Sequence, residues 1–338
     1  MVPNAICVVA KCPIPGKSKT RLSAADAAGL TDEGCALMAK AMLCDVLSSI
    51  HRAKALSSVA KHPVVKFLYF APADEEGMKR MGSILDELSM LYVDGSQTLA
   101  QADRRREYQK LGCSERGLDV LRYDAWYLCP MPDARQSNLR SSDLGIKLAG
   151  MLDYTRSTVW NDLGDIDAAI TPPAVAFLGM DSPELPIGEI AHALQLASRQ
   201  LPHSSATEEI PGSAYINPSH DGGYGMLCLP PQAPASVFEG VRWSDPLTAI
   251  SQMKALSDEG IPVVIGSLMR DIDEMEDLMG LAERLRIARK KTGSADEADK
   301  ERGGDILCRP PKGREIEAAQ SDDNMCRYSW EAILQLKL

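Results

Sequence analysis

Four cations lie within eleven residues near the start of the chain, namely Lys11, Lys17, Lys19 and Arg21. Lysine offers a point charge and arginine a two-pronged donor, and both bind phosphate oxygens. The cluster follows an apolar stretch over 5–10 that is typical of a buried strand, and the loop after the first strand of a parallel sheet is a usual phosphate site. The spacing predicts a phosphate-binding loop, although it is not that of a P-loop. The alternative is a solvated basic surface loop.

A single carboxylate, Asp181, follows the apolar stretch 174–180. Placed at the end of a strand and facing a basic loop, it could bind a Mg²⁺ or Mn²⁺ that bridges to a diphosphate. A helix N-cap or a loop-closing role stays open for it. Asp271 and Asp273 follow the last expected strand, and alternate residues point the same way in an extended segment. One of the two could supply a second metal carboxylate.

Two adjacent glycines, Gly222 and Gly223, stand directly before another expected strand. Such a pair permits positive φ angles and the close approach of a ligand to the backbone. The preceding Asp221 could bind a ligand or metal, deprotonate an acceptor as a general base, or simply make an Asx turn. Asp143, at an expected helix start, and Trp243 are weaker candidates for the acceptor side. A tryptophan such as Trp243 is more often a packing residue than a ligand platform.

Expected strands and helices, which must position these residues, alternate along the chain from residue 5 to about residue 290. Strands are expected at 5–10, 64–70, 174–180, 214–217, 224–229 and 261–266. Helices are expected to begin near Thr31, Ser142 and Met275 and to cover 74–90, 187–201 and 246–259. This alternation predicts an α/β fold with a mostly parallel central sheet and helices on both faces.

Two polar stretches interrupt the alternation. Residues 97–138 are expected to be an insertion within a domain that covers 1–289. Residues 290–338 are expected to form a polar C-terminal tail, partly disordered, whose last short helix near 330–336 could pack back on the domain.

The composition excludes several classes of protein. Lys plus Arg is 37 and Asp plus Glu is 47 among 338 residues, a net charge of −10. This argues against a nucleic-acid partner, because such proteins usually carry excess cations. Apolar stretches are too short to suggest a membrane span or a membrane partner. The nine cysteines are odd in number and none is spaced C-x-x-C, which indicates reduced thiols, no zinc site and a cytoplasmic protein.

Six ordered motifs resemble those of the bacterial rSAM/selenodomain-associated transferase family: AKCPIPGKSKTRL, DLGIKL, LGMDSPELP, HDGGYGMLCL, FEGVRWSDP and DIDEMEDL. That family has a GT-A-like nucleotide-diphospho-sugar transferase fold, a Rossmann-type sandwich. It is more distantly similar to the molybdenum-cofactor guanylyltransferases and 2-phospho-lactate guanylyltransferase. The resemblance covers residues 5 to about 285, apart from the insertion.

The resemblance implies roles for particular residues. It places the nucleotide phosphates at Gly16, Lys19, Thr20 and Arg21. It implies that Asp181 holds the divalent ion. It also implies that the acceptor side is lined by Asp221, Gly222, Gly223 and Tyr224.

Three functions agree with these features. The first is a metal-dependent transferase that moves a glycosyl group from a nucleotide-sugar to a small-molecule acceptor, with Mg²⁺ or Mn²⁺ stabilising the leaving diphosphate. The second is a nucleotidyltransferase that joins an NTP to a phosphorylated small molecule and releases pyrophosphate. The third is a non-catalytic nucleotide-binding protein of the same fold, because a fold does not guarantee an activity.

Overall fold

The computed structural model describes residues 3–23, 29–52, 64–95, 125–132, 143–162, 172–198, 212–301 and 326–338. The chain forms two compact units. Unit 1 comprises Met1–Cys12 and Val46–Asp271, and unit 2 comprises Pro13–Asp45 and Ile272–Leu338.

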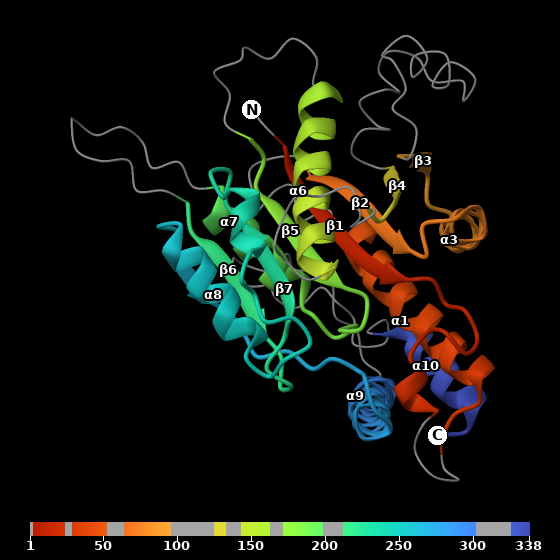
Figure 1. Cartoon of the computed structure of the whole chain (residues 1–338). Coiled ribbons are helices and arrows are strands. Elements are labelled where there is room, and N and C mark those ends of the chain that lie inside the picture. The colour runs from red at the N-terminus through yellow and green to blue at the C-terminus, as the bar shows by residue number, and fades with distance from the viewer. Residues whose placement is uncertain are drawn as a thin grey trace, which may run out of the picture. The chain divides into compact units, whose positions relative to one another are not determined.

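Unit 1 is built on an eight-stranded sheet, whose described strands follow the order β3-β4-β2-β1-β5-β7-β6-β8. Figure 1 labels these strands from β3 at one edge to β6 near the other. The strands are β1 Asn4–Lys11, β2 Val64–Ala71, β3 Tyr92–Asp94, β4 Trp126–Pro130, β5 Val175–Gly179, β6 Ala214–Pro218, β7 Tyr224–Leu229 and β8 Val263–Ile265. β7 pairs antiparallel with β5 and β6, and the other neighbours pair parallel. The prediction of a mostly parallel sheet is confirmed.

Helices cover both faces of this sheet. On one face, α6 (Asp143–Asp162) and α8 (Thr248–Asp258) share a core with strand residues that include Phe67 and Phe177. On the other face, His192 of α7 (Ile187–Ala197) packs edge-on against Tyr215. The residues on either side of Tyr215 in β6 belong to the core of the first face, and successive side chains of a strand point to opposite faces. α3 (Glu75–Glu87) packs on β2 and β4. The predicted arrangement with helices on both faces is therefore confirmed.

The predicted insertion contains one strand of the sheet. Trp126–Pro130 lies inside 97–138, yet it forms β4 between β3 and β2. Trp126 and Leu128 are fully buried, because an inner strand of a sheet is covered on both sides. Treating the whole of 97–138 as an insertion is wrong at this strand, whose short apolar stretch is hidden among polar residues. Residues 97–124 and 133–138 lie outside the described residues.

The predicted domain boundary at residue 289 falls inside α9 (Met275–Glu301). The expected C-terminal helix is present as α10 (Arg327–Leu336). Residues 302–325 lie outside the described residues, so the partly disordered tail and the boundary stay predictions.

Unit 2 has its own apolar core, formed by the first part of α1 (Asp32–Arg52) together with α9 and α10. Thr31 caps α1 as the sequence predicts, since its Oγ1 accepts a hydrogen bond from the backbone N–H of Gly34 at 3.1 Å. The core also contains Leu22, which is fully buried. Leu22 ends the short helix η1 (Thr20–Leu22) and so anchors the cationic loop.

A membrane-spanning stretch was not expected, but α1 is long and apolar enough to cross a membrane by length and composition alone. In the structure, 78% of the most apolar 18-residue segment of α1 is buried within the protein. Such burial is typical of a core helix.

The start of α10 is held by a buried carboxylate of α1. Asp45 is 4% exposed and accepts hydrogen bonds from the backbone N–H groups of Tyr328 at 2.9 Å and Ser329 at 2.8 Å. Burial raises the pKa of the Asp45 carboxyl to about 6, although these hydrogen bonds and the charge of Arg289 oppose the rise.

Asp45 should make the stability of the protein depend on pH. Because its pKa is higher in the folded than in the unfolded chain, its contribution is complete below pH 4 and is lost as the pH rises through about 6. We expect wild type to lose on the order of 2 kcal/mol relative to Asp45→Asn between pH 4 and pH 7.5. Urea unfolding at both pH values measures this. A pH-independent difference between wild type and Asp45→Asn would contradict the assignment.

Candidate functional site

Predicted site residues of unit 1 meet at one edge of the sheet. The parallel strands β1 and β5 end there at Lys11 and Gly179, and the antiparallel strand β7 begins there at Tyr224. The backbone N–H of Lys11 donates to the Sδ of Met180 at 3.2 Å, which joins the chain at the ends of β1 and β5. Parallel α/β sheets bind ligands beyond this carboxyl edge.

Asp181 lies in the turn directly after β5, as the sequence predicts. Its carboxylate folds back over the end of the strand, because a Cβ added to Gly179 would lie 2.6 Å from Asp181 Oδ1. The absence of a side chain at Gly179 therefore makes room for this carboxylate. Asp181 is half-buried.

The neighbouring residue Ser182 was not singled out from the sequence. Its hydroxyl is buried and has no hydrogen-bond partner among the described residues. It faces β7, since a Cβ on Gly225 would come within 2.9 Å of Ser182 Oγ. A buried hydroxyl without a partner costs about 1–3 kcal/mol. No sequence signal separates such a serine from one exposed in a turn.

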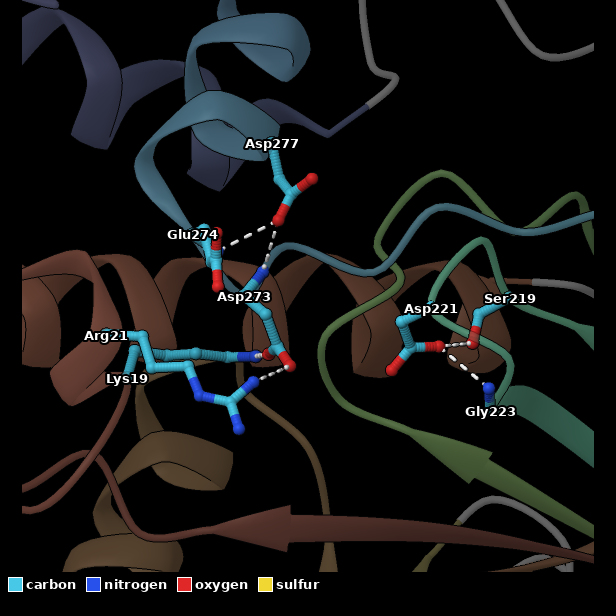
Figure 2. Close-up of polar contacts among 8 residues, drawn as sticks. All are labelled: Lys19, Arg21, Ser219, Asp221, Gly223, Asp273, Glu274 and Asp277. Carbon is cyan, nitrogen blue, oxygen red and sulfur yellow. Dashed lines mark hydrogen bonds and ion pairs between the residues drawn. The ribbon is translucent and has the colours of Figure 1, made fainter. Parts of the chain in front are cut away.

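Asp221 makes the Asx turn that the sequence left open. Its Oδ1 accepts hydrogen bonds from the Ser219 hydroxyl and, at 2.8 Å, from the backbone N–H of Gly223 (Figure 2). These bonds hold the carboxylate in a defined position at the edge of the sheet. The general-base role of Asp221 stays a prediction.

Gly222 has a conformation that its sequence position predicted. Its φ is +88°, and a Cβ added there would lie 1.9 Å from the backbone oxygen of Pro246. The carbonyl of Gly222 accepts a hydrogen bond from the N–H of Ala249 at 2.9 Å. The close approach that the paired glycines suggested is thus made with the chain itself, at the start of α8.

The two aromatic candidates pack against the core of unit 1. Tyr224 donates its hydroxyl to Gln252 Oε1 at 3.1 Å, and Gln252 is fully buried. The rings of Tyr224 and Trp243 meet edge-on with centroids 6.3 Å apart, and the Trp243 indole N–H is buried without a partner among the described residues. These contacts favour the packing alternative for Trp243. Contact of either ring with an acceptor stays a prediction.

From Pro13 onward the cationic loop belongs to unit 2, where Lys19 and Arg21 converge on one carboxylate (Figure 2). Lys19 Nζ lies 2.6 Å from Asp273 Oδ1, and Arg21 Nη1 lies 3.5 Å from Asp273 Oδ2. The Lys19 side chain is 10% exposed and that of Arg21 is 70% exposed. The loop therefore holds an anionic group between a sheltered ammonium and an open guanidinium.

Hydrogen bonds within the loop fix its shape. The Ser18 hydroxyl accepts from the N–H of Ile14 and donates to its carbonyl, both at 3.0 Å. Gly16 has a φ of +69°. Thr20 is exposed, and its carbonyl accepts from the Ser23 hydroxyl at 2.7 Å. Phosphate contacts of Gly16, Thr20 and the exposed Lys11 stay predictions.

Asp181 offers a carboxylate, which is a kind of ligand that a hard divalent cation takes. Mg²⁺ and Mn²⁺ prefer oxygen ligands and accept a single carboxylate when phosphate and water complete their coordination. Within the described ranges, no group of three or more His, Cys, Asp or Glu residues could hold a metal by itself. Asp271 or Asp273 was predicted to supply a second metal carboxylate. In the structure the Asp273 carboxylate forms an ion pair with Lys19. Asp271 stays a candidate ligand.

Asp143 and the cysteines are the remaining residues about which the sequence makes a prediction. Asp143 is the first residue of α6, as expected for an acid at a helix start, and its role on the acceptor side stays a prediction. Seven cysteines in the described segments are buried.

One family model matches part of the chain. It is described as "uncharacterized protein conserved in bacteria (DUF2064)" and matches residues 124–245, about a third of the sequence. The matched stretch contains Asp181 and the Asp221 turn but not the loop with Lys19. No curated protein matches this chain in sequence.

One solved structure shows which fold this is. A protein of Desulfovibrio desulfuricans G20, provisionally called a nucleotide-diphospho-sugar transferase, superposes with a TM-score of 0.50 at 17% sequence identity, over 83% of this chain and 87% of that one. The chain has the nucleotide-diphospho-sugar transferase fold. The predicted GT-A-like architecture is thereby confirmed, and at this identity the likeness extends to the fold alone.

A second solved structure is a 4-diphosphocytidyl-2C-methyl-D-erythritol synthase. It is 9% identical, covers 82% of this chain and 95% of its own, and has a TM-score of 0.36. That score is too low to add to the fold assignment.

Proposed function

We propose that this protein is a metal-dependent transferase of the GT-A class, which moves a glycosyl group from a nucleotide-sugar to a small acceptor. The observation that carries the proposal is the convergence of Lys19 and Arg21 on the two oxygens of one carboxylate. Two cations that hold adjacent oxygens of a carboxylate have the charge and spacing needed for adjacent phosphate oxygens. The fold is that of nucleotide-diphospho-sugar transferases.

In this proposal each residue has a separate role in the transfer reaction. Lys19 and Arg21 neutralise the diphosphate, and Asp181 would hold Mg²⁺ or Mn²⁺. When bound, the ion stabilises the negative charge that develops on the departing nucleoside diphosphate. As the bond from the sugar carbon to the diphosphate oxygen breaks, the acceptor oxygen bonds to that carbon and gives its proton to Asp221.

Nucleotidyl transfer is the second candidate, because it needs the same cations and the same ion. Attack would then fall on the α-phosphorus of an NTP and release pyrophosphate. Thermal-shift measurements with Mn²⁺ and a panel of NTPs and sugar nucleotides would find the donor, since a ligand that binds the folded state stabilises it. Product analysis with that donor then decides. Pyrophosphate release from an NTP, without use of any sugar nucleotide, would refute glycosyl transfer; binding without turnover would favour a non-catalytic protein.

The phosphate role of the loop predicts a graded loss of affinity. Lys19→Ala should weaken the binding of UDP or GDP by about 10- to 100-fold, the value of a sheltered charged hydrogen bond of about 1.5–3 kcal/mol. Arg21→Ala should cost less, about threefold, because water screens an exposed charge. Isothermal titration calorimetry measures both.

Lys17→Ala is the matched control, since it removes an equal charge from an exposed position in the same loop. Its affinity should stay within about twofold of wild type. Equal losses for Lys17→Ala and Lys19→Ala, or no loss for Lys19→Ala, would contradict specific phosphate binding at Lys19.

A further inference from the structure

The ion pair between Lys19 and Asp273 joins residues 254 positions apart in the chain. Its N–O distance of 2.6 Å and the 10% exposure of the Lys19 side chain distinguish it from an ordinary surface pair. Asp273 is 34% exposed and reaches Arg21 with its second oxygen. One carboxylate thus contacts both cations to which we assign the diphosphate.

Both sides of this pair are held in place. On the carboxylate side, Asp277 Oδ2 accepts hydrogen bonds from the backbone N–H groups of Asp273 at 3.1 Å and Glu274 at 2.8 Å (Figure 2). This arrangement resembles a capping box at the start of α9. On the cation side, Lys19 has a left-handed backbone with φ 49°, and the chain is anchored three residues later by buried Leu22.

These hydrogen bonds leave the Asp273 side chain itself able to turn. Asp277 bonds to the backbone of Asp273, whereas the Asp273 carboxylate itself contacts Lys19 and Arg21. A competing anion could therefore displace the carboxylate without opening the start of α9. The backbone would keep Asp273 close to any anion bound at Lys19.

We propose that Asp273 is an internal competitor of the nucleotide diphosphate for Lys19 and Arg21. This inference rests on the proposed function. A phosphate that binds the two cations replaces the Asp273 carboxylate and then lies beside its negative charge. Weakly charged anions gain too little to do this, whereas a diphosphate carries enough charge, so Asp273 makes the loop selective for diphosphates.

The sign of a charge-removing substitution tests this. Isothermal titration calorimetry with inorganic pyrophosphate, in EDTA, compares wild type with Asp273→Asn. If the carboxylate competes, Asp273→Asn binds pyrophosphate more tightly, by about 5- to 30-fold, and its preference for pyrophosphate over inorganic phosphate falls. Glu274→Gln is the matched control, because it removes an equal charge from the next residue. Its affinity stays within about twofold of wild type.

Unchanged or weaker pyrophosphate binding by Asp273→Asn overturns the inference, as does an equal gain in Glu274→Gln. A repeat with Mg²⁺ separates competition from metal binding, because a metal ligand would make Asp273→Asn weaker where a competitor makes it tighter. Thermal melting checks that the variant is folded, and Asp273→Ser replaces it if it is not.

Lys19→Ala separates this inference from the proposed function on which it rests. If Lys19→Ala binds pyrophosphate as wild type does, the phosphate role of the loop fails and the competitor role fails with it. If Lys19→Ala weakens binding and Asp273→Asn does not tighten it, only the competitor role is lost.

Discussion

Gly222→Ala is expected to lose about 4 kcal/mol or more of unfolding free energy, a large part of the 5–15 kcal/mol that is typical of a domain. The added Cβ would lie 1.9 Å from the backbone oxygen of Pro246. A backbone atom cannot rotate away as the end of a side chain can, so the chain at Pro246 or the Asp221 turn must shift. The φ of +88° adds the cost of a left-handed conformation.

Gly240→Ala separates the two causes of this loss. Gly240 also has a positive φ, +70°, but a Cβ there meets nothing within 4 Å. Its replacement should cost only the backbone term, about 1–2 kcal/mol. Urea unfolding of both variants provides the comparison, with soluble yield as a second measure for Gly222→Ala. Similar losses in the two variants would show that the contact with Pro246 contributes little.

Asp181→Asn is expected to reduce metal-dependent turnover by at least about 100-fold while the unfolding free energy stays within about 1 kcal/mol of wild type. Asparagine keeps the size of the side chain but removes the charge that would hold Mg²⁺ or Mn²⁺. An ion that stabilises a leaving diphosphate contributes several kcal/mol to the transition state, and about 100-fold corresponds to 2.7 kcal/mol. The donor found by the thermal-shift panel serves as substrate.

Binding provides a second readout for Asp181 that does not require turnover. Wild type should bind UDP or GDP more tightly in Mn²⁺ than in EDTA, and Asp181→Asn should lose this difference. Glu184→Gln removes an equal charge from the same turn and should keep it. Equal nucleotide binding by wild type in Mn²⁺ and in chelator would end the metal role of Asp181 and favour a binding protein without catalysis.

Asp181 and the Asp221 turn illustrate how far the sequence alone reaches into the candidate site. Asp181 directly follows an apolar stretch that is recognisable as a strand, and parallel strands end at the same edge of a sheet. Its placement at the carboxyl edge is confirmed. Asp221 stands before its strand and reaches the same edge because β7 runs antiparallel to β5, which the sequence did not predict. Whether each side chain faces a ligand or the protein could not be predicted, and Tyr224 shows this, because its hydroxyl bonds to buried Gln252.

The sequence by itself determined the α/β class, the mostly parallel sheet and the capping of α1 by Thr31, because these follow from the period of apolar residues and from local hydrogen bonds. Tertiary structure alone decided that Trp126–Pro130 is an inner strand. It also decided that Gly222 is pressed against Pro246 and that Asp273 pairs with Lys19. The last two contacts join residues distant in the chain. The period of apolar residues describes only residues that are near one another in sequence, so partners that are distant in the chain are known only once the chain has packed.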